Sequence, residues 1–316
     1  LIFFLIYCSK KIKKIEHLSN TKENFYDYVT FIPYNDKYIV LGRYHQERDY
    51  IKGFFVNQKF NEKKELKIFI NNKNSNKINT SIVHNFTATI VGQNKFIANA
   101  GRDPWSDILY YDKGHDKGMY FFTGSIKNNS LYFKENGLKI TKNTGAAQSH
   151  PASNECFTPI FSSNDKYYIY CRYNIRRGER LSQVFVSENG IDNWNLRGIV
   201  TLRNDKNKIL TNYSIYMMNI GKLDNKFYSL IRYSQGKLNK ETDDNSYKLY
   251  LFESDNGLDF KVVKLIKSGN FWPCYGYVIK NNCLHFFILE RYKNLISELI
   301  IDKNQNIKMN WEVLKL

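Results

Sequence analysis

Four side chains in this sequence have the chemistry for acid/base catalysis and stand beside strand-like segments: Glu155, Asp103, Asp27 and His84. Glu155 lies in the otherwise apolar approach to a strand, "SNECFTP", and the Phe-Thr shared with "HNFT" places His84 in the equivalent position of another segment. Hydrolysis of a glycosidic bond needs one carboxylic acid to protonate the leaving oxygen and a second carboxylate as nucleophile or base. We therefore predict Glu155 as general acid, Asp27 or Asp103 as second carboxylate, and His84 in an assisting role.

Each of these residues also has an ordinary structural interpretation. Asp103, in "RDPW", could form a turn before proline, and Asp27 could be an exposed loop carboxylate. His84 could be a hydrogen-bonded histidine of the core. The chemical interpretation therefore depends on whether the fold brings these side chains together.

Arginines end several strand-like runs, and guanidinium groups bind carboxylate, sulfate or phosphate in a fixed fork. This pattern favours an anionic substrate, although an arginine at a strand end can also be a surface residue whose stem covers apolar neighbours. Two aromatic residues at first-strand starts could stack on sugar rings. The predicted substrate-binding residues are Arg43, Arg102, Arg172, Arg232, Asn85, Tyr213 and Trp272.

The elements that must position these residues recur five times along the chain. An Asn or Asp turn precedes an aromatic, strand-like run that ends at or near arginine. The copies are "NDKYIVLGRY" at Asn35, "QNKFIANAGRD" at Gln93, "NDKYYIYCRY" at Asn164, "DNKFYSLIRY" at Asp224 and "NNCLHFFILERY" at Asn281. Each follows another strand-like run, and their starts are roughly 60 residues apart, which indicates a repeat architecture.

A second phrase, "KENGLKI", "SENGIDNW" or "SDNGLDF", follows three of the copies. Its Gly supplies the positive φ that a tight outer hairpin needs. Each unit then contains four antiparallel strands, so the sequence predicts an all-β fold, a five-bladed β-propeller. A β-sandwich is the rival architecture, but it does not explain a period that runs through the whole chain.

In such a propeller, the start of each first strand and the end of each second strand share one face. Asp27, His84 and Glu155 should then meet the arginines there, with Glu290–Arg291 contributed by the fifth unit. Residues 21–316 are predicted to form one domain, because no linker rich in Pro, Gly or Ser interrupts the repeats. Residues 1–20 are interpreted as the remnant of a signal or anchor, which would fit secretion or membrane attachment, or as a closing strand.

The 316 residues carry a net charge of +17, from 47 basic and 30 acidic residues. Such a chain attracts anionic partners, and an acidic oligo- or polysaccharide is the expected class. Lysines are scattered, so nucleic acid is not expected as a partner. The N-terminal "LIFFLIYC" is too short to cross a bilayer. The 5 cysteines show no metal-ligand spacing, and neither a metal nor a cofactor is expected.

The five-unit plan with "SENGIDNW" and "SDNGLDF" resembles the five-bladed propeller glycoside hydrolases, the invertase-like and arabinanase-like superfamily. "RDP" at Arg102–Pro104 and "EC" at Glu155–Cys156 are similar to the invertase-type Arg-Asp-Pro and Glu-Cys motifs. This resemblance implies that Asp103 stabilises the transition state and that Glu155 is the acid/base. It also implies a divergent member, because the invertase motif that carries the nucleophile has no match near Asp27.

Two further departures concern the site. The repeat places "RDP" at the end of a second strand, whereas the invertase-like enzymes have it at a first-strand start. The arabinanase-like pattern has Asp, Asp and Glu at three first-strand starts, where this chain has Asp27, His84 and Glu155. A non-catalytic glycan-binding or interaction propeller is therefore the alternative to a glycosidase. A phosphorylase, in which arginines bind phosphate as co-substrate, is the third.

Overall fold

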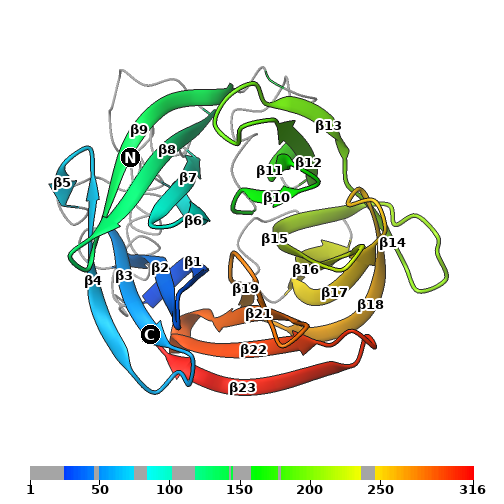
Figure 1. Ribbon diagram of the computed structural model, residues 1–316. Helices are drawn as coiled ribbons and strands as arrows, with labels where there is room; N and C mark the ends of the chain where they lie inside the picture. Colours follow the sequence, from blue (N-terminus) through cyan, green and yellow to red (C-terminus); the bar gives the residue numbers. More distant parts are fainter. Residues whose placement is uncertain are drawn as a thin grey trace, which may run out of the picture.

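The computed structural model describes residues 25–45, 50–74, 84–101, 118–141, 144, 158–176, 179–235 and 246–316. These residues form strands that are arranged around a central axis, with the first strands innermost and strands such as β18 and β23 at the periphery (Figure 1). The N-terminal strand and the C-terminal strand belong to neighbouring parts of this ring. The all-β propeller predicted from the repeats is the observed fold class.

The described strands form four hydrogen-bonded sheets, in which consecutive strands pair antiparallel as meanders. We assign these meanders as five blades, of which the first two are joined by parallel pairing of their outermost strands. The first consists of β1 (Phe25–Tyr34), β2 (Lys37–His45), β3 (Tyr50–Asn57) and β4 (Lys63–Ile70), and the second of β6 (His84–Gly92), β7 (Lys95–Gly101), β8 (Gly118–Lys127) and β9 (Ser130–Thr141). The third consists of β10 (Phe161–Ser163), β11 (Lys166–Arg176), β12 (Glu179–Ser187) and β13 (Asn195–Ile199).

The fourth blade consists of β15 (Tyr213–Leu223), β16 (Lys226–Gln235), β17 (Lys248–Ser254) and β18 (Asp259–Ser268). In the fifth, β19 (Phe271–Pro273) and β20 (Val278–Lys280) both pair with β21 (Cys283–Glu290), which is followed by β22 (Leu295–Ile301) and β23 (Ile307–Lys315). Three short elements complete the described chain: β5 (Lys73–Asn74), β14 (Thr201–Arg203) and the 3-10 helix η4 (Arg291–Lys293).

The core is divided among clusters of buried apolar side chains, and each cluster lies between two neighbouring blades. Ile68 of the first blade and Phe122 of the second share one cluster, while Val29 and Phe287 join the first blade to the fifth. The backbone N–H of Phe31 also donates to the carbonyl of Tyr275 at 2.8 Å across that last junction. The blades therefore pack on each other in a closed ring.

The repeated Asn or Asp phrase forms the turn between the first and second strand of each blade, as predicted. Each of these turns contains a residue in the left-handed conformation, which Asn and Asp tolerate because their short polar side chains bond locally. Those residues are Asn35, Asn94, Asn164, Asp165, Asp224, Asn281 and Asn282. The opposite end of each hairpin is then where first strands begin and second strands end.

The second phrase forms the outer turn in two of its three copies. Ser187 Oγ accepts hydrogen bonds from the N–H groups that follow it, including that of Gly190, between β12 and β13. Ser254 makes the same turn between β17 and β18. The prediction is wrong for "KENGLKI", which lies inside β9. The tight turn of Asn128 and Asn129, both with positive φ, already joins β8 to β9.

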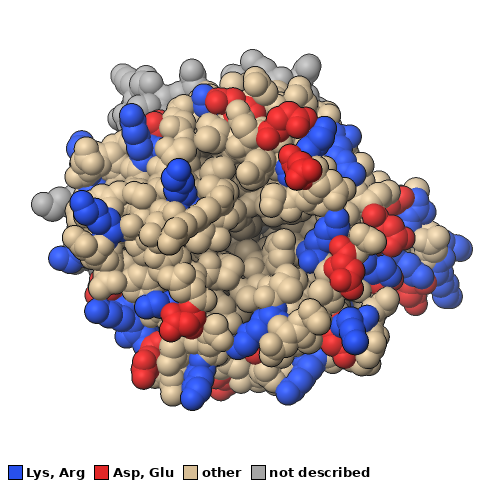
Figure 2. Space-filling model, viewed as in Figure 1, with Lys and Arg blue, Asp and Glu red and all other residues tan. Residues whose placement is uncertain are grey.

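The surface has a hollow at the centre of the face viewed, while most charged side chains lie toward the periphery (Figure 2). Among the described residues, no helix has the length and apolar character needed to cross a membrane.

Candidate functional site

First strands begin and second strands end at one end of the axis, which we call the mouth. In the first blade Asp27 of β1 pairs with Arg43 of β2, and in the fifth Phe271 of β19 pairs with Glu290 of β21. In the fourth, Arg232 lies near the end of β16, opposite the start of β15. The face predicted to collect acidic and arginine residues is therefore the mouth.

Asp27 is the centre of an ion-pair cluster at the mouth. Arg43 donates from Nε to Oδ1 and from Nη2 to Oδ2, each at 2.8 Å. Nε2 of His45 lies 2.8 Å from Oδ2, and Nη2 of Arg291 donates to the same oxygen at 3.1 Å. Burial alone would raise the pKa of Asp27, but the nearby Arg43 and His45 outweigh it and hold this pKa well below its usual range.

The interpretation of Asp27 as an exposed loop carboxylate is wrong, because its side chain has 0% exposed surface. Both oxygens are bound, so Asp27 would reach a substrate only if one of its partners released an oxygen. Its role as second carboxylate stays a prediction. The structure shows that it joins the first blade to the fifth, since Arg291 belongs to η4.

Trp272 lies against two guanidinium groups of the mouth. The Cζ atom of Arg291 is 4.3 Å from its ring centroid and that of Arg232 is 5.2 Å from it. The indole is 1% exposed, and its Nε1 has no hydrogen-bond partner among the described residues. Trp272 therefore offers no open face to a sugar ring in this structure. Its predicted stacking role would require the ring to become exposed.

Tyr216 is the aromatic residue on which the other arginines converge. The Cζ atoms of Arg232, Arg180 and Arg172 lie 5.0, 5.2 and 5.9 Å from its ring centroid. Tyr216 is half-buried and sits at a bulge of β15, where it has no partner in β16. A bulge reverses the alternation of side chains along a strand, so no sequence signal shows that this tyrosine, and not Tyr213, meets the arginines.

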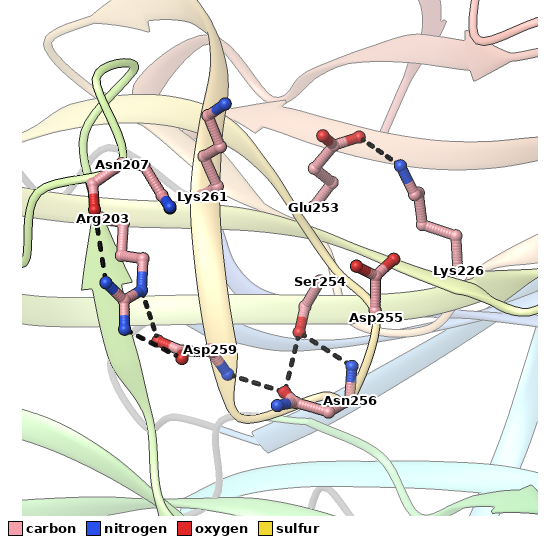
Figure 3. A pocket seen from close by; sticks show the side chains of 9 residues that line it. All are labelled: Arg203, Asn207, Lys226, Glu253, Ser254, Asp255, Asn256, Asp259 and Lys261. Carbon is pink, nitrogen blue, oxygen red and sulfur yellow. Dashed lines mark hydrogen bonds and ion pairs between the residues drawn. The ribbon is translucent and has the colours of Figure 1, made fainter.

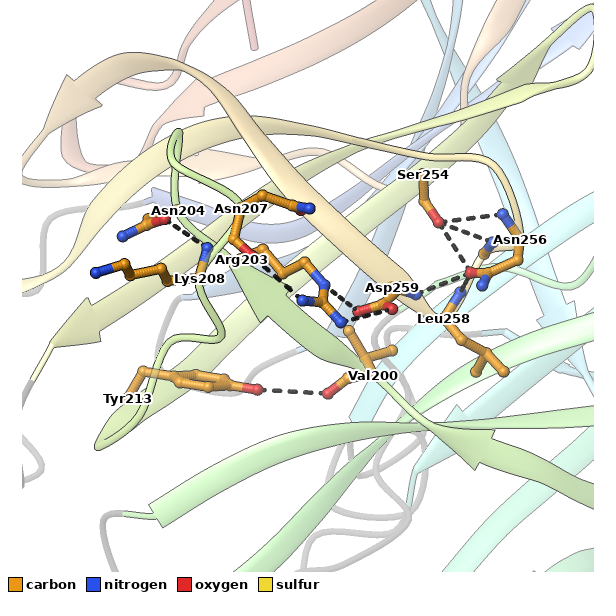
Figure 4. A network of polar contacts seen from close by, with 11 residues as sticks. Val200, Arg203, Asn204, Asn207, Lys208, Tyr213, Ser254, Asn256, Leu258 and Asp259 are labelled. Atoms are coloured by element: carbon orange, nitrogen blue, oxygen red, sulfur yellow. Dashed lines mark hydrogen bonds and ion pairs between the residues drawn. The ribbon is translucent and has the colours of Figure 1, made fainter.

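Tyr213 makes its described contacts elsewhere. Its hydroxyl donates to the carbonyl of Val200 at 3.4 Å (Figure 4). Its ring packs edge-on against Tyr233. Among the described contacts of Tyr213, none involves an arginine of the mouth. Its predicted role as a platform for sugar stays a prediction without support from these contacts.

Asn85, the second residue of β6, has a left-handed conformation with φ 54°. Tyr28 has the same conformation at the equivalent irregularity of β1, with φ 49°. The Asn85 side chain is 1% exposed, and neither amide atom has a hydrogen-bond partner in the described part of the chain. A buried polar group left in this way costs about 1–3 kcal/mol. Such a cost is understandable if a ligand supplies the missing partners, which supports the predicted binding role.

Three predicted residues, Glu155, Asp103 and Arg102, lie outside the described residues, and for His84 only the backbone is described, paired with Gly101. The distance between Glu155 and a second carboxylate therefore stays untested. Five of the other predicted residues lie at the mouth and take part in its ion-pair and cation–aromatic contacts: Asp27, Arg43, Arg172, Arg232 and Trp272. Sequence reasoning did not assign a role to His45, Arg180 or Tyr216.

Cavities also lie away from the mouth, and two of them have contrasting linings. A polar hollow of about 300 Å³ sits at the outer edge of the fourth blade (Figure 3). Its charged side chains bind one another, as Arg203 Nε does with Asp259 at 2.9 Å. An apolar cavity of about 340 Å³ lies at the turn end of the axis and is lined by first-strand residues such as Ile32, Ile90 and Ile220. Neither is lined by the arginine groups of the mouth.

No family model matches this sequence, and no curated protein matches it. Solved structures do match. A GH43_1 enzyme from Xanthomonas citri has a TM-score of 0.60 at 8% identity and covers 93% of this chain and 94% of its own. A GH32 β-fructofuranosidase from Bombyx mori has a TM-score of 0.59 at 11% identity over 90% of this chain. This chain spans 62% of the length of the Bombyx mori protein.

A third structure, a family 117 glycoside hydrolase from Zobellia galactanivorans, has a TM-score of 0.51 at 12% identity and covers 74% of this chain and 70% of its own. At such identities the likeness concerns the fold. It agrees with the ring of antiparallel meanders and with the resemblance implied by the outer-turn phrases. The chain therefore has the β-propeller fold of these glycoside hydrolases.

Proposed function

We propose that this protein hydrolyses a glycan that carries anionic groups, and that the glycan binds at the mouth. The observation that carries the proposal is the convergence of five arginines from four blades on aromatic rings and one buried carboxylate. Guanidinium groups recognise carboxylate and sulfate, and aromatic rings pack against sugars. The glycoside hydrolases that share the fold support a carbohydrate as the partner.

In this proposal Glu155 is the general acid, and Asp103 or Asp27 is the second carboxylate, with His84 assisting. Asp27 is the less suited of the two carboxylates, because two guanidinium groups and the ring of His45 already occupy its oxygens. Its low pKa fits a group that stays ionised, as a nucleophile or base must, but not a general acid.

The test is turnover of oligosaccharides that contain uronate or sulfate, measured by release of reducing ends. Wild type should release them, and Glu155→Gln should lower kcat by about 100-fold or more, the size of a general-acid contribution. Binding of the same oligosaccharide by Glu155→Gln should persist. Turnover that is equal in wild type and variant would overturn the assignment of Glu155.

A second candidate function, non-catalytic glycan binding, is favoured by the state of Asp27. A carboxylate whose two oxygens are bound by Arg43, His45 and Arg291 has a structural use that needs no catalysis. This candidate predicts that the protein binds an anionic oligosaccharide without turnover. Adding inorganic phosphate distinguishes the phosphorylase, since only that activity would require it.

A further inference from the structure

We propose that Tyr292, supported by Phe25, is an aromatic platform on which one sugar ring of the glycan stacks at the rim of the mouth. The proposal rests on the proposed function in taking the ligand to be a glycan. It adds a binding contact that depends on the apolar face of a sugar and not on its charge. It assigns the stacking role to two residues for which the sequence predicted no role.

Tyr292 is an exposed aromatic residue of the mouth, with 45% of its surface accessible to solvent. Two other aromatic residues in the described part of the chain are comparably exposed, Tyr132 and Trp311, and they lie on the outermost strands β9 and β23. Tyr292 instead belongs to η4, which follows β21 at the mouth. It is adjacent in sequence to Arg291, which binds Asp27. This ring is therefore the one that a ligand reaches beside the Asp27 cluster.

Phe25 and Tyr292 together form a corner. Their ring centroids are 5.5 Å apart, and their planes meet at 66°. Phe25 also stacks on His45, with ring centroids 4.2 Å apart. The Cζ atom of Arg291 lies 4.7 Å from the ring of Phe25 and 5.3 Å from that of Tyr292. The corner therefore combines apolar ring surface with the polar groups that surround Asp27.

The turn that carries Tyr292 is fixed by two neighbouring segments. The backbone N–H of Tyr26, at the start of β1, donates to Oδ1 of Asn294 at 2.9 Å. The N–H of Leu316, the last residue of the sequence given, donates to the carbonyl of Asn294 at 2.9 Å. A ring that is held in place before the ligand arrives loses less conformational freedom on binding, which favours affinity.

The chemistry of the platform suits a pyranose ring. Aromatic side chains offer a large, rigid apolar surface, and the C–H groups on one face of a sugar are stabilised when they leave water. Trp272 is 1% exposed, and the described contacts of Tyr213 lie away from the mouth arginines. We therefore assign the stacking contact to Tyr292, while the charged substituents of the glycan remain matched to the arginines of the mouth.

The experiment is isothermal titration of wild type and Tyr292→Ala with an oligogalacturonate, a chondroitin sulfate oligosaccharide and a neutral xylo-oligosaccharide. For the oligosaccharide that wild type binds, Tyr292→Ala should weaken binding by about tenfold, equivalent to about 1.4 kcal/mol. Because stacking involves no charge, this ratio should be the same at low and at high salt. A ratio near one, or a ratio that disappears at high salt, would overturn the proposal.

Further variants separate the ring from its hydroxyl and from other exposed tyrosines. Tyr292→Phe and Tyr292→Trp keep an aromatic face and should bind as wild type. Nη1 of Arg291 donates to the Tyr292 hydroxyl at 3.4 Å, so equal losses in Tyr292→Phe and Tyr292→Ala would assign the effect to this bond and contradict the platform. The matched control is Tyr132→Ala, which removes an exposed tyrosine that stacks on Phe69. Equal losses in Tyr132→Ala and Tyr292→Ala would contradict the proposed location.

Each variant is first compared with wild type by thermal unfolding, and little change is expected because Tyr292 is exposed. Binding that depends on Tyr292 without turnover would support the platform and refute only the hydrolytic function. Such binding of the neutral oligosaccharide alone would contradict only the anionic character of the glycan. Hydrolysis with the same KM in wild type and Tyr292→Ala would refute the platform alone. A wild type that binds none of the three oligosaccharides would overturn the platform and the proposed function together.

Discussion

The carboxylate of Asp27, which has no exposed surface, and the guanidinium of Arg43 form two parallel hydrogen bonds of 2.8 Å at the mouth. Two further groups, His45 and Arg291, complete the shell of the carboxylate. Since Arg291 follows the last-blade strand β21, this one carboxylate lies where the ring of blades closes.

Asp27→Asn should destabilise the protein by about 3–5 kcal/mol, because it leaves two guanidinium groups without the anion that compensates their burial. Urea unfolding followed by tryptophan fluorescence measures this loss. The control is Asp36→Asn, which alters an exposed carboxylate of the turn between β1 and β2. A loss in the free energy of unfolding of under about 1 kcal/mol for Asp27→Asn is the range of a surface ion pair. Such a loss would contradict the role of Asp27 in stabilising the junction between the first and fifth blades.

The same ion pairs predict how stability depends on pH. The pKa of Asp27 is lower in the folded protein than the value of about 3.9 in the unfolded chain, so the unfolded state binds the proton first. Its contribution is therefore present above about pH 5 and declines as the pH falls. The difference in urea midpoint between wild type and Asp27→Asn should narrow from pH 7 toward pH 3. A difference that stays constant or widens over this range would be inconsistent with a depressed pKa.

Asn85→Gly should leave the free protein at least as stable as wild type while weakening its affinity for ligand. Glycine adopts φ 54° without strain, and removing the buried amide removes a cost of about 1–3 kcal/mol. Thermal unfolding and calorimetric binding of glucuronate measure the two effects. Asn128→Gly, at an exposed left-handed turn residue, should change neither. Loss of stability in Asn85→Gly with unchanged binding would show that the amide serves the fold.

The repeated Asn or Asp phrase was enough to predict the first two strands of each blade, the turn between them and the end of the axis where arginines gather, whereas the second phrase marked the outer turn in only two of its three copies. Asn and Asp turns can be recognised from sequence because few residue types other than Gly, Asn and Asp readily adopt the left-handed conformation. Side-chain contacts across blades were not accessible in the same way. The bulge at Tyr216 changes which residue points to the arginines, and Arg180 belongs to a third strand whose start the phrase does not mark. Asp27 and Trp272 both contact Arg291, which lies far from Asp27 in sequence.

The central claim is that the mouth acts on a glycan because the glycan is negatively charged. One matched pair of substrates tests this claim most directly. A uronate-containing oligosaccharide and the same oligosaccharide after reduction of its carboxyl groups differ only in charge. We expect kcat/KM for the uronate form to be higher by about tenfold or more, equivalent to about 1.4 kcal/mol of transition-state binding. Equal values, or a preference for the reduced form, would contradict the account.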